Sequence, residues 1–213
     1  MKTIECKIFS DIICPWCLIG WTNLKQAQER LNGSIALDVQ WLPYELNPAM
    51  PPGGMDRQDY LTTKFGGEQR ATEIYGRIEQ AATAAGVHVS FDKISRTPNS
   101  LMAHRLILRA GEHQRATQVK EALFQHYFVD GLDIGDVEVL IDTAVACGMD
   151  EEATRTYLLG DEGTEPVRAW EAEAGRLGIS GVPFFIIDQK YGLSGAQPPD
   201  MFVRALTEIG EAD

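Results

Sequence analysis

Two cysteines near the start of the chain, Cys14 and Cys17, are separated by only two residues. Such a pair serves as half of a metal site, as a structural disulfide or as a reactive dithiol. A zinc site needs four ligands, but Cys6 and Cys147 are isolated and the four histidines show no ligand spacing, so no metal is expected. A disulfide across so short a loop would restrict the unfolded chain very little. The reactive dithiol is therefore the favoured interpretation.

The segments around the pair favour the same chemistry. Alternating apolar residues predict a strand over 4–10, and helical spacing begins at Pro15 and ends near Gly33. Cys14 is then the residue that caps the helix, and Pro15 stands in the first turn, where its missing N–H has no cost. Because the positive end of a helix stabilises an anion, we expect a lowered pKa for the Cys14 thiol. Cys17, one turn later, lies within reach as a resolving thiol.

The remaining segments predict the fold. A second strand over 35–43 follows the helix, which makes a parallel strand–helix–strand unit. A loop rich in Pro and Gly leads to a long helical region over 56–177, including a helix capped by Thr97 and closed by Gly111. An antiparallel hairpin over 183–195 and an amphipathic helix complete the chain. The pattern predicts an α/β, thioredoxin-like fold, formed by residues 1–47 and 165–213, with a large all-helical insertion over 48–164.

One further segment fits a thioredoxin-like dithiol, although it is distant in sequence. Val182 and Pro183 precede the third strand, and a cis bond between them would turn the Val182 main chain towards the cysteines, where it could pair with an extended substrate. A trans proline at the start of a strand is the commoner local conformation. The cysteine pair makes the cis form the favoured prediction.

Several phrases of the sequence, in order, resemble the DsbA-like thioredoxin-domain family and specifically its FrnE-like branch. They are "FSDIICPWCLIGW", "LPYELNP", "RTPNSLMAHRLI" and "LGISGVPFFIID", and the likeness covers nearly the whole chain. The resemblance implies a thiol:disulfide oxidoreductase in which Cys14 attacks, Cys17 resolves the mixed disulfide and Pro183 is the cis-proline. It also makes Arg96 and Asn99 candidate substrate contacts, against a plainer role in capping a helix.

The chain also differs from the better-known members of the family. Exported DsbA oxidants carry a histidine inside the motif, where this chain has Trp16. An indole adds no positive charge, so we interpret Trp16 as apolar contact surface beside Cys14. Strong oxidising behaviour is not implied.

Two other functions are compatible with the same fold. The related 2-hydroxychromene-2-carboxylate isomerases and kappa-class glutathione transferases bind glutathione and typically have serine at the position of Cys14. Because both cysteines are present, the oxidoreductase is favoured, with no tightly bound cofactor and with glutathione as a candidate redox partner. A non-enzymatic interaction module would leave the dithiol unexplained.

The charge composition limits the classes of partner that we expect. The formal net charge is −12 with no basic cluster, which disfavours nucleic acid and anionic membranes as partners. We expect a protein or small thiol that carries a disulfide or dithiol; the oligomeric state is left open. The first residues lack the apolar segment of a signal peptide, so the cytoplasm is the expected location.

The remaining histidines and cysteines considered are expected to be structural. His104 and His126 lie on apolar helical stripes, and Cys6 and Cys147 are expected to be buried apolar groups.

Overall fold

The computed structural model describes residues 2–211 and contains a central four-stranded sheet in the order β2-β1-β5-β6. Strand β1 (Lys2–Ser10) pairs in parallel with β2 (Ile35–Pro43) and antiparallel with β5 (Phe184–Ile187), which forms a hairpin with β6 (Tyr191–Ser194). The sheet therefore joins the two ends of the chain. The thioredoxin-like α/β fold predicted from the sequence is confirmed.

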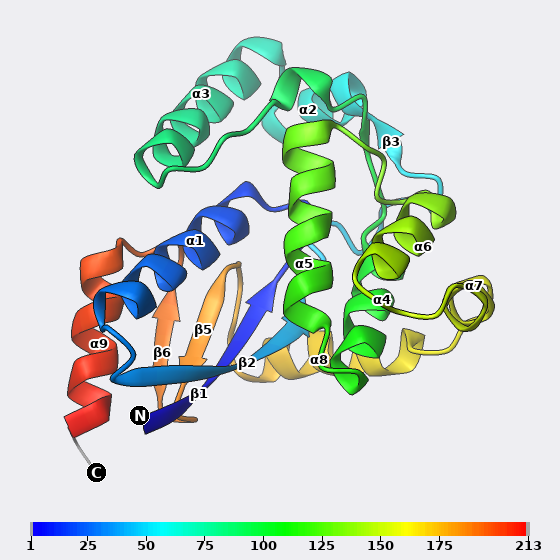
Figure 1. Ribbon diagram of the computed structural model, residues 1–213. Helices are drawn as coiled ribbons and strands as arrows, with labels where there is room; N and C mark the ends of the chain where they lie inside the picture. The colour runs from blue at the N-terminus through cyan, green and yellow to red at the C-terminus, as the bar shows by residue number, and fades with distance from the viewer. Residues whose placement is uncertain (1, 212–213) are drawn as a thin grey trace.

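Helices cover both faces of this sheet (Figure 1). On one face, α1 (Pro15–Arg30) and α9 (Pro199–Glu211) pack over strand residues such as Ile8 and Phe185. On the other face, Phe9 and Leu42 pack against α8 (Thr164–Arg176). This alternation follows from the strand geometry, because successive side chains point to opposite faces.

The region between β2 and α8 is mainly helical and lies to one side of the sheet in Figure 1. Its helices are α2 (Arg57–Phe65), α3 (Glu68–Ala84), α4 (Leu101–Glu112), α5 (Ala116–Gln125), α6 (Val137–Ala146) and α7 (Glu151–Leu159), and α5 continues as a single π turn over His126–Asp130. The main apolar core runs without interruption from the sheet into α4, α5 and α6. The predicted domain boundaries stay a prediction.

Two local predictions in the helical region are wrong. Thr97 does not cap a helix; it lies buried in a short strand, β4 (Arg96–Thr97), which pairs with β3 (Met55–Asp56). Helix α4 starts only at Leu101, whose N–H is accepted by Asn99 Oδ1 at 2.9 Å. Pro98 disfavours helical geometry in the residue before it, which is why Thr97 is extended. Gly111 lies inside α4 and does not close it.

The two cysteines outside the pair differ from each other. Cys6 is completely buried in the core, as expected. Cys147 is only half-buried, because it follows the last turn of α6 at the edge of the helical region. The prediction of a buried role is therefore wrong for Cys147.

Candidate dithiol site

Cys14 and Cys17 lie where β1 passes into α1, at the end of the central strand. Cys14 is the N-cap of α1, with extended backbone angles (φ −92°, ψ 110°), and Pro15 occupies the first turn. Both cysteines are free and buried, with exposed fractions of 4% and 1%. The turn that joins them is closed by the N–H of Cys17, which donates to the carbonyl of Cys14 at 3.0 Å. The strand and the helix start therefore hold the two thiols together, as the spacing predicted.

The segment before β5 faces this pair from across the fold. The bond between Val182 and Pro183 is cis, and Cys14 Sγ lies 3.6 Å from the carbonyl oxygen of Val182. Gly20 lets α1 pack closely here, because a Cβ at that position would lie only 3.0 Å from Pro183 Cγ. Trp16 is 39% exposed beside Cys14 and is a large apolar side chain on the surface. Residues distant in sequence thus form one site.

The two thiols share a hydrogen bond and titrate as a pair. This bond, donated by Cys14, raises the pKa of the Cys14 thiol well above its ordinary value, and burial adds to the effect. Burial also acts to raise the pKa of Cys17, but the bond from Cys14, the charge of Lys120 and the nearby Ser10 hydroxyl outweigh it and leave that pKa lowered. In the reduced pair the pKa of Cys14 is therefore raised, contrary to the low pKa predicted from the helix start.

A buried carboxylate, Asp11, lies at the base of the pair. Its Oδ2 accepts the N–H of Leu46 at 2.7 Å, and its Oδ1 accepts the N–H of Ile13 at 3.4 Å. His104 Nε2 from α4 lies 3.4 Å from the same Oδ1. Burial acts to raise the pKa of Asp11, but His104 and the Leu46 N–H outweigh it and leave that pKa lowered. Asp11 therefore remains ionised in a position where a lone charge would be costly.

His104 meets the expectation of a structural core residue, because it is 2% exposed and paired with Asp11. Burial lowers its pKa, so the neutral imidazole is favoured. His126 is half-buried and bonded through Nδ1 to Thr143 Oγ1 at 3.0 Å, which also fits a structural role.

Sequence reasoning missed Asp11 and Lys120 as parts of this site. Lys120 is 1% exposed and lies on the buried face of α5 together with Val119 and Leu123. Its place on an apolar helical stripe was a usable signal, because lysine rarely occupies the interior without a partner. Asp11 offered no comparable pattern, since a single acid after a strand is common in loops.

Arg96 and Asn99 make contacts that hold a loop of the helical region. Arg96 bonds to the carbonyl of Gly53 and pairs with Asp133 at 3.4 Å. Asn99 Nδ2 donates to the carbonyl of Met50 at 2.7 Å. These bonds fasten the Pro- and Gly-rich loop to β4 and α4, which agrees with the plainer structural role. Substrate contact by either residue stays a prediction.

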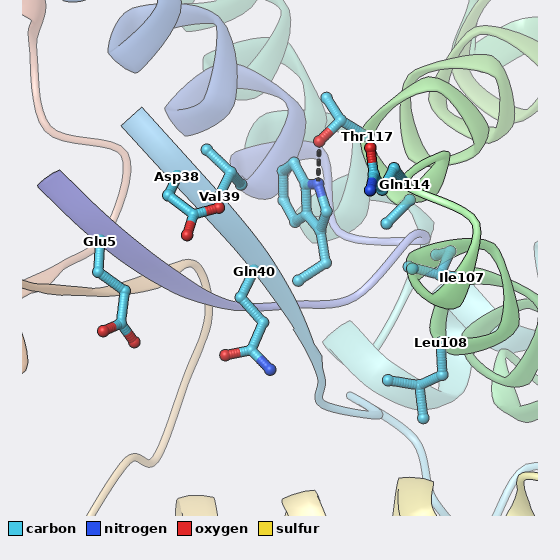
Figure 2. Close-up of a pocket in the computed structure, with 11 residues that line it drawn as sticks. Glu5, Asp38, Val39, Gln40, Ile107, Leu108, Gln114 and Thr117 are labelled. Atoms are coloured by element: carbon cyan, nitrogen blue, oxygen red, sulfur yellow. Dashed lines mark hydrogen bonds between the residues drawn. The ribbon is translucent and has the colours of Figure 1, made fainter. Parts of the chain in front are cut away.

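A cavity of about 620 Å³ lies away from the dithiol, between the edge strand β2 and helices α4 and α5. Figure 2 shows its lining and the hydrogen bond, 3.0 Å long, from the indole of Trp41 to Thr117. Neither cysteine lines this cavity, and neither do Val182 and Pro183. The chemistry of the dithiol is therefore not located in it.

Comparison with known proteins places this geometry in a family. Residues 5–207 match the model of the DSBA-like thioredoxin domain. The chain belongs to the DSBA-like thioredoxin domain family. A crystal structure described as a probable DsbA oxidoreductase, SCO1869 from Streptomyces coelicolor, shares 32% identity at a TM-score of 0.87, covering 99% of this chain and 92% of that one.

Other solved structures share the fold at lower sequence identity. The cytosolic disulfide reductase DsbM from Pseudomonas aeruginosa is 20% identical at a TM-score of 0.68, with 96% of this chain and 98% of that chain covered. A 2-hydroxychromene-2-carboxylate isomerase is 16% identical at the same TM-score, with 96% and 95% covered. These two proteins are described with different activities, so the fold by itself does not define the activity of this chain.

Proposed function

We propose that this protein is a thiol:disulfide oxidoreductase in which Cys14 is the nucleophile and Cys17 the resolving cysteine. The observation that carries the proposal is the position of Cys14 at the start of α1, with its sulfur 3.6 Å from the Val182 carbonyl. An extended substrate that pairs with the Val182 main chain would bring its disulfide to Cys14. Exposed Trp16 would provide apolar contact beside the reacting sulfur.

The exchange begins when the Cys14 thiolate attacks a substrate disulfide, so that one substrate sulfur leaves as a thiolate and a mixed disulfide forms at Cys14. Cys17 then passes its proton to that released thiolate and attacks Cys14 Sγ, which breaks the mixed disulfide and releases the second substrate sulfur as a thiolate. The substrate gains two electrons and the protein forms a Cys14–Cys17 disulfide. The reverse sequence oxidises a substrate dithiol.

The same proposal includes the partner and the compartment. DsbM, which shares the fold, is described as a cytosolic disulfide reductase and has also been crystallised with glutathione. These descriptions support glutathione or another thiol compound as redox partner, the cytoplasm as location and reduction as the prevailing direction. No helix among residues 2–211 is long and apolar enough to cross a membrane.

Redox titration of the purified protein in glutathione buffers tests the proposal. Thiols are trapped at each ratio of reduced to oxidised glutathione and assigned by mass spectrometry, with Cys17→Ser as the variant that cannot close the intramolecular bond. We expect a reversible Cys14–Cys17 disulfide in the natural sequence. Glutathione bound without any exchange at Cys14 would contradict the proposal and favour the isomerase or transferase alternative.

A further inference from the structure

Strand β2 is an edge of the central sheet, with β1 as its neighbour on one side and no strand among residues 2–211 on the other. The N–H of Lys2 donates to the carbonyl of Ser34 at 3.0 Å, just before β2 begins. Because main-chain groups of a strand alternate in direction, the N–H and C=O of Asp38 also turn towards β1. Those of Leu37 and Val39 therefore point to the open edge.

The cavity of about 620 Å³ lies along this edge. Figure 2 shows β2 with β1 on one side and with Ile107 and Leu108 of α4 across the cavity on the other. The bond from Trp41 to Thr117 links β2 to α5 beside the same space. Its volume falls within the range of about 300–1,000 Å³ that is usual for binding cavities. The open edge of β2 therefore faces a space that α4 and α5 leave free.

Unpaired main-chain groups of an edge strand are a template for a further strand. Proteins usually protect such an edge with a lysine, a proline or a bulge, and none of these occurs over 35–42. The side chains of an added strand would alternate between the two faces of the sheet. Asp38 and Gln40 lie on one face of β2, next to the cavity. Val39 and Trp41 lie on the other face.

The charges at the cavity indicate which kind of strand fits. Its lining includes Glu5 and Asp38 but no lysine or arginine. Glu5 pairs with Lys7 at 2.8 Å, whereas Asp38 has no ion pair within residues 2–211. Antiparallel pairing with a second copy of β2 would bring two Asp38 carboxylates together, because Asp38 is one residue from the middle of the strand. The net charge of −12 also repels a second copy and attracts a basic segment.

We propose that the open edge of β2 is a docking site for an extended protein segment in which basic residues alternate with apolar ones. The segment adds to the sheet as a strand, and the N–H and C=O groups of Leu37 and Val39 bond to its main chain. Its basic side chains lie beside Asp38, and its apolar side chains lie on the face of Val39. The site is separate from the dithiol and goes beyond the proposed oxidoreductase function.

The first test uses a short fluorescent peptide that alternates lysine and valine, and a matched peptide with glutamate in place of lysine. Fluorescence anisotropy measures binding to the natural protein, to Asp38→Lys and to Asp142→Lys. Asp142 is a control because it is exposed on α6, which does not line the cavity. Asp38→Lys should weaken binding of the lysine peptide about threefold or more, because an opposite-charge pair across two strands becomes a like-charge pair.

The control variant and the second peptide define the outcomes of this test. Asp142→Lys makes the same change in net charge and should weaken binding less than Asp38→Lys does. Equal weakening in the two variants, or equal binding of the lysine and glutamate peptides by the natural protein, would overturn the proposal.

A second test addresses the main chain of β2. Val39→Pro removes an N–H that points to the open edge, where proline is tolerated because the bonds to β1 are kept. Val39→Ala is the matched control, since it shortens the side chain but keeps the N–H. Loss of one hydrogen bond should make the proline variant bind the lysine peptide about fivefold more weakly than the alanine variant does. Equal binding by the two variants would overturn the proposal.

Hydrogen exchange in the natural protein covers the case in which Val39→Pro does not fold. The lysine peptide should slow exchange of the N–H groups of Leu37 and Val39, whereas the N–H of Asp38 already bonds to β1 and should change less. Binding without slower exchange at Leu37 and Val39 would mean attraction by charge alone and would overturn the proposal. A dimer in sedimentation that protects these two groups without peptide would show that a second copy occupies the edge, which also overturns it.

The outcome is independent of the dithiol, because the peptides contain no cysteine. If the peptide binds as expected but no Cys14–Cys17 disulfide forms, only the oxidoreductase function fails. If the disulfide forms and the peptide does not bind, only this inference fails.

Discussion

Replacing Glu45 by glutamine should stabilise the protein above neutral pH. Glu45 follows β2, its side chain is fully buried against Arg168, and its Oε1 has no hydrogen-bond partner among residues 2–211. Burial is the main cause that raises the pKa of Glu45 from 4.5 to about 7, and the charge of Glu171 adds to it. The next residue, Leu46, donates its N–H to Asp11, so this loop also supports the dithiol site.

The sign follows from linkage between protonation and folding. A carboxyl whose pKa is higher in the folded than in the unfolded protein stabilises the fold below its unfolded value, here 4.5, and that stability is lost as the pH rises through about 7. The gap between these pKa values corresponds to about 3 kcal/mol. Glutamine also lacks the negative charge that pairs with Arg168, but Arg168 still forms an ion pair with Glu171. We therefore expect Glu45→Gln to gain about 1–2 kcal/mol above neutral pH.

Urea denaturation of the two proteins at several pH values measures this effect. The free energy of unfolding of the natural protein should fall, relative to that of Glu45→Gln, as the pH rises from about 5 to about 8. Glu165→Gln is a control for net charge, because Glu165 is exposed in the first turn of α8. Parallel pH profiles for the natural protein and Glu45→Gln, or a less stable variant at high pH, would refute the reasoning.

Three further outcomes are expected around the dithiol. Gly20→Val would place side-chain atoms against Pro183. The variant should lose about 1–3 kcal/mol of stability, measured by denaturation, and should exchange disulfides with glutathione more slowly. An unchanged exchange rate would count against the role of Pro183. Asp11→Ala should destabilise the fold by about 1–3 kcal/mol, because it leaves the buried N–H groups of Leu46 and Ile13 without their acceptor, and Asp11→Asn should cost less; equal losses in the two variants would contradict the importance of the polar contacts. Cys17→Ser incubated with oxidised glutathione should accumulate a mixed disulfide on Cys14 that mass spectrometry detects, and glutathione attached elsewhere would argue against Cys14 as nucleophile.

Much of the fold could be predicted from local patterns in the sequence. The alternation in β1 and β2, the helical spacing after Pro15 and the apolar runs of the hairpin predict the strand–helix–strand unit and the antiparallel pair that the structure contains. These predictions hold because each element buries one face, and burial leaves a repeat of two or of 3.6 residues in the sequence. The short strand at Thr97 leaves no such repeat and was missed.

The cysteine pair could likewise be predicted from the sequence, because Cys14, Pro15 and Cys17 are neighbours and their geometry is set by a single helix start. The surroundings that decide the charge of the pair could not. Asp11 and His104 come from a loop and a helix far apart in the chain, and only packing brings them together. Because electrostatic effects depend on distance and on burial in three dimensions, the sequence determined where the two cysteines lie at the start of a helix, and the tertiary structure decided which buried groups surround them.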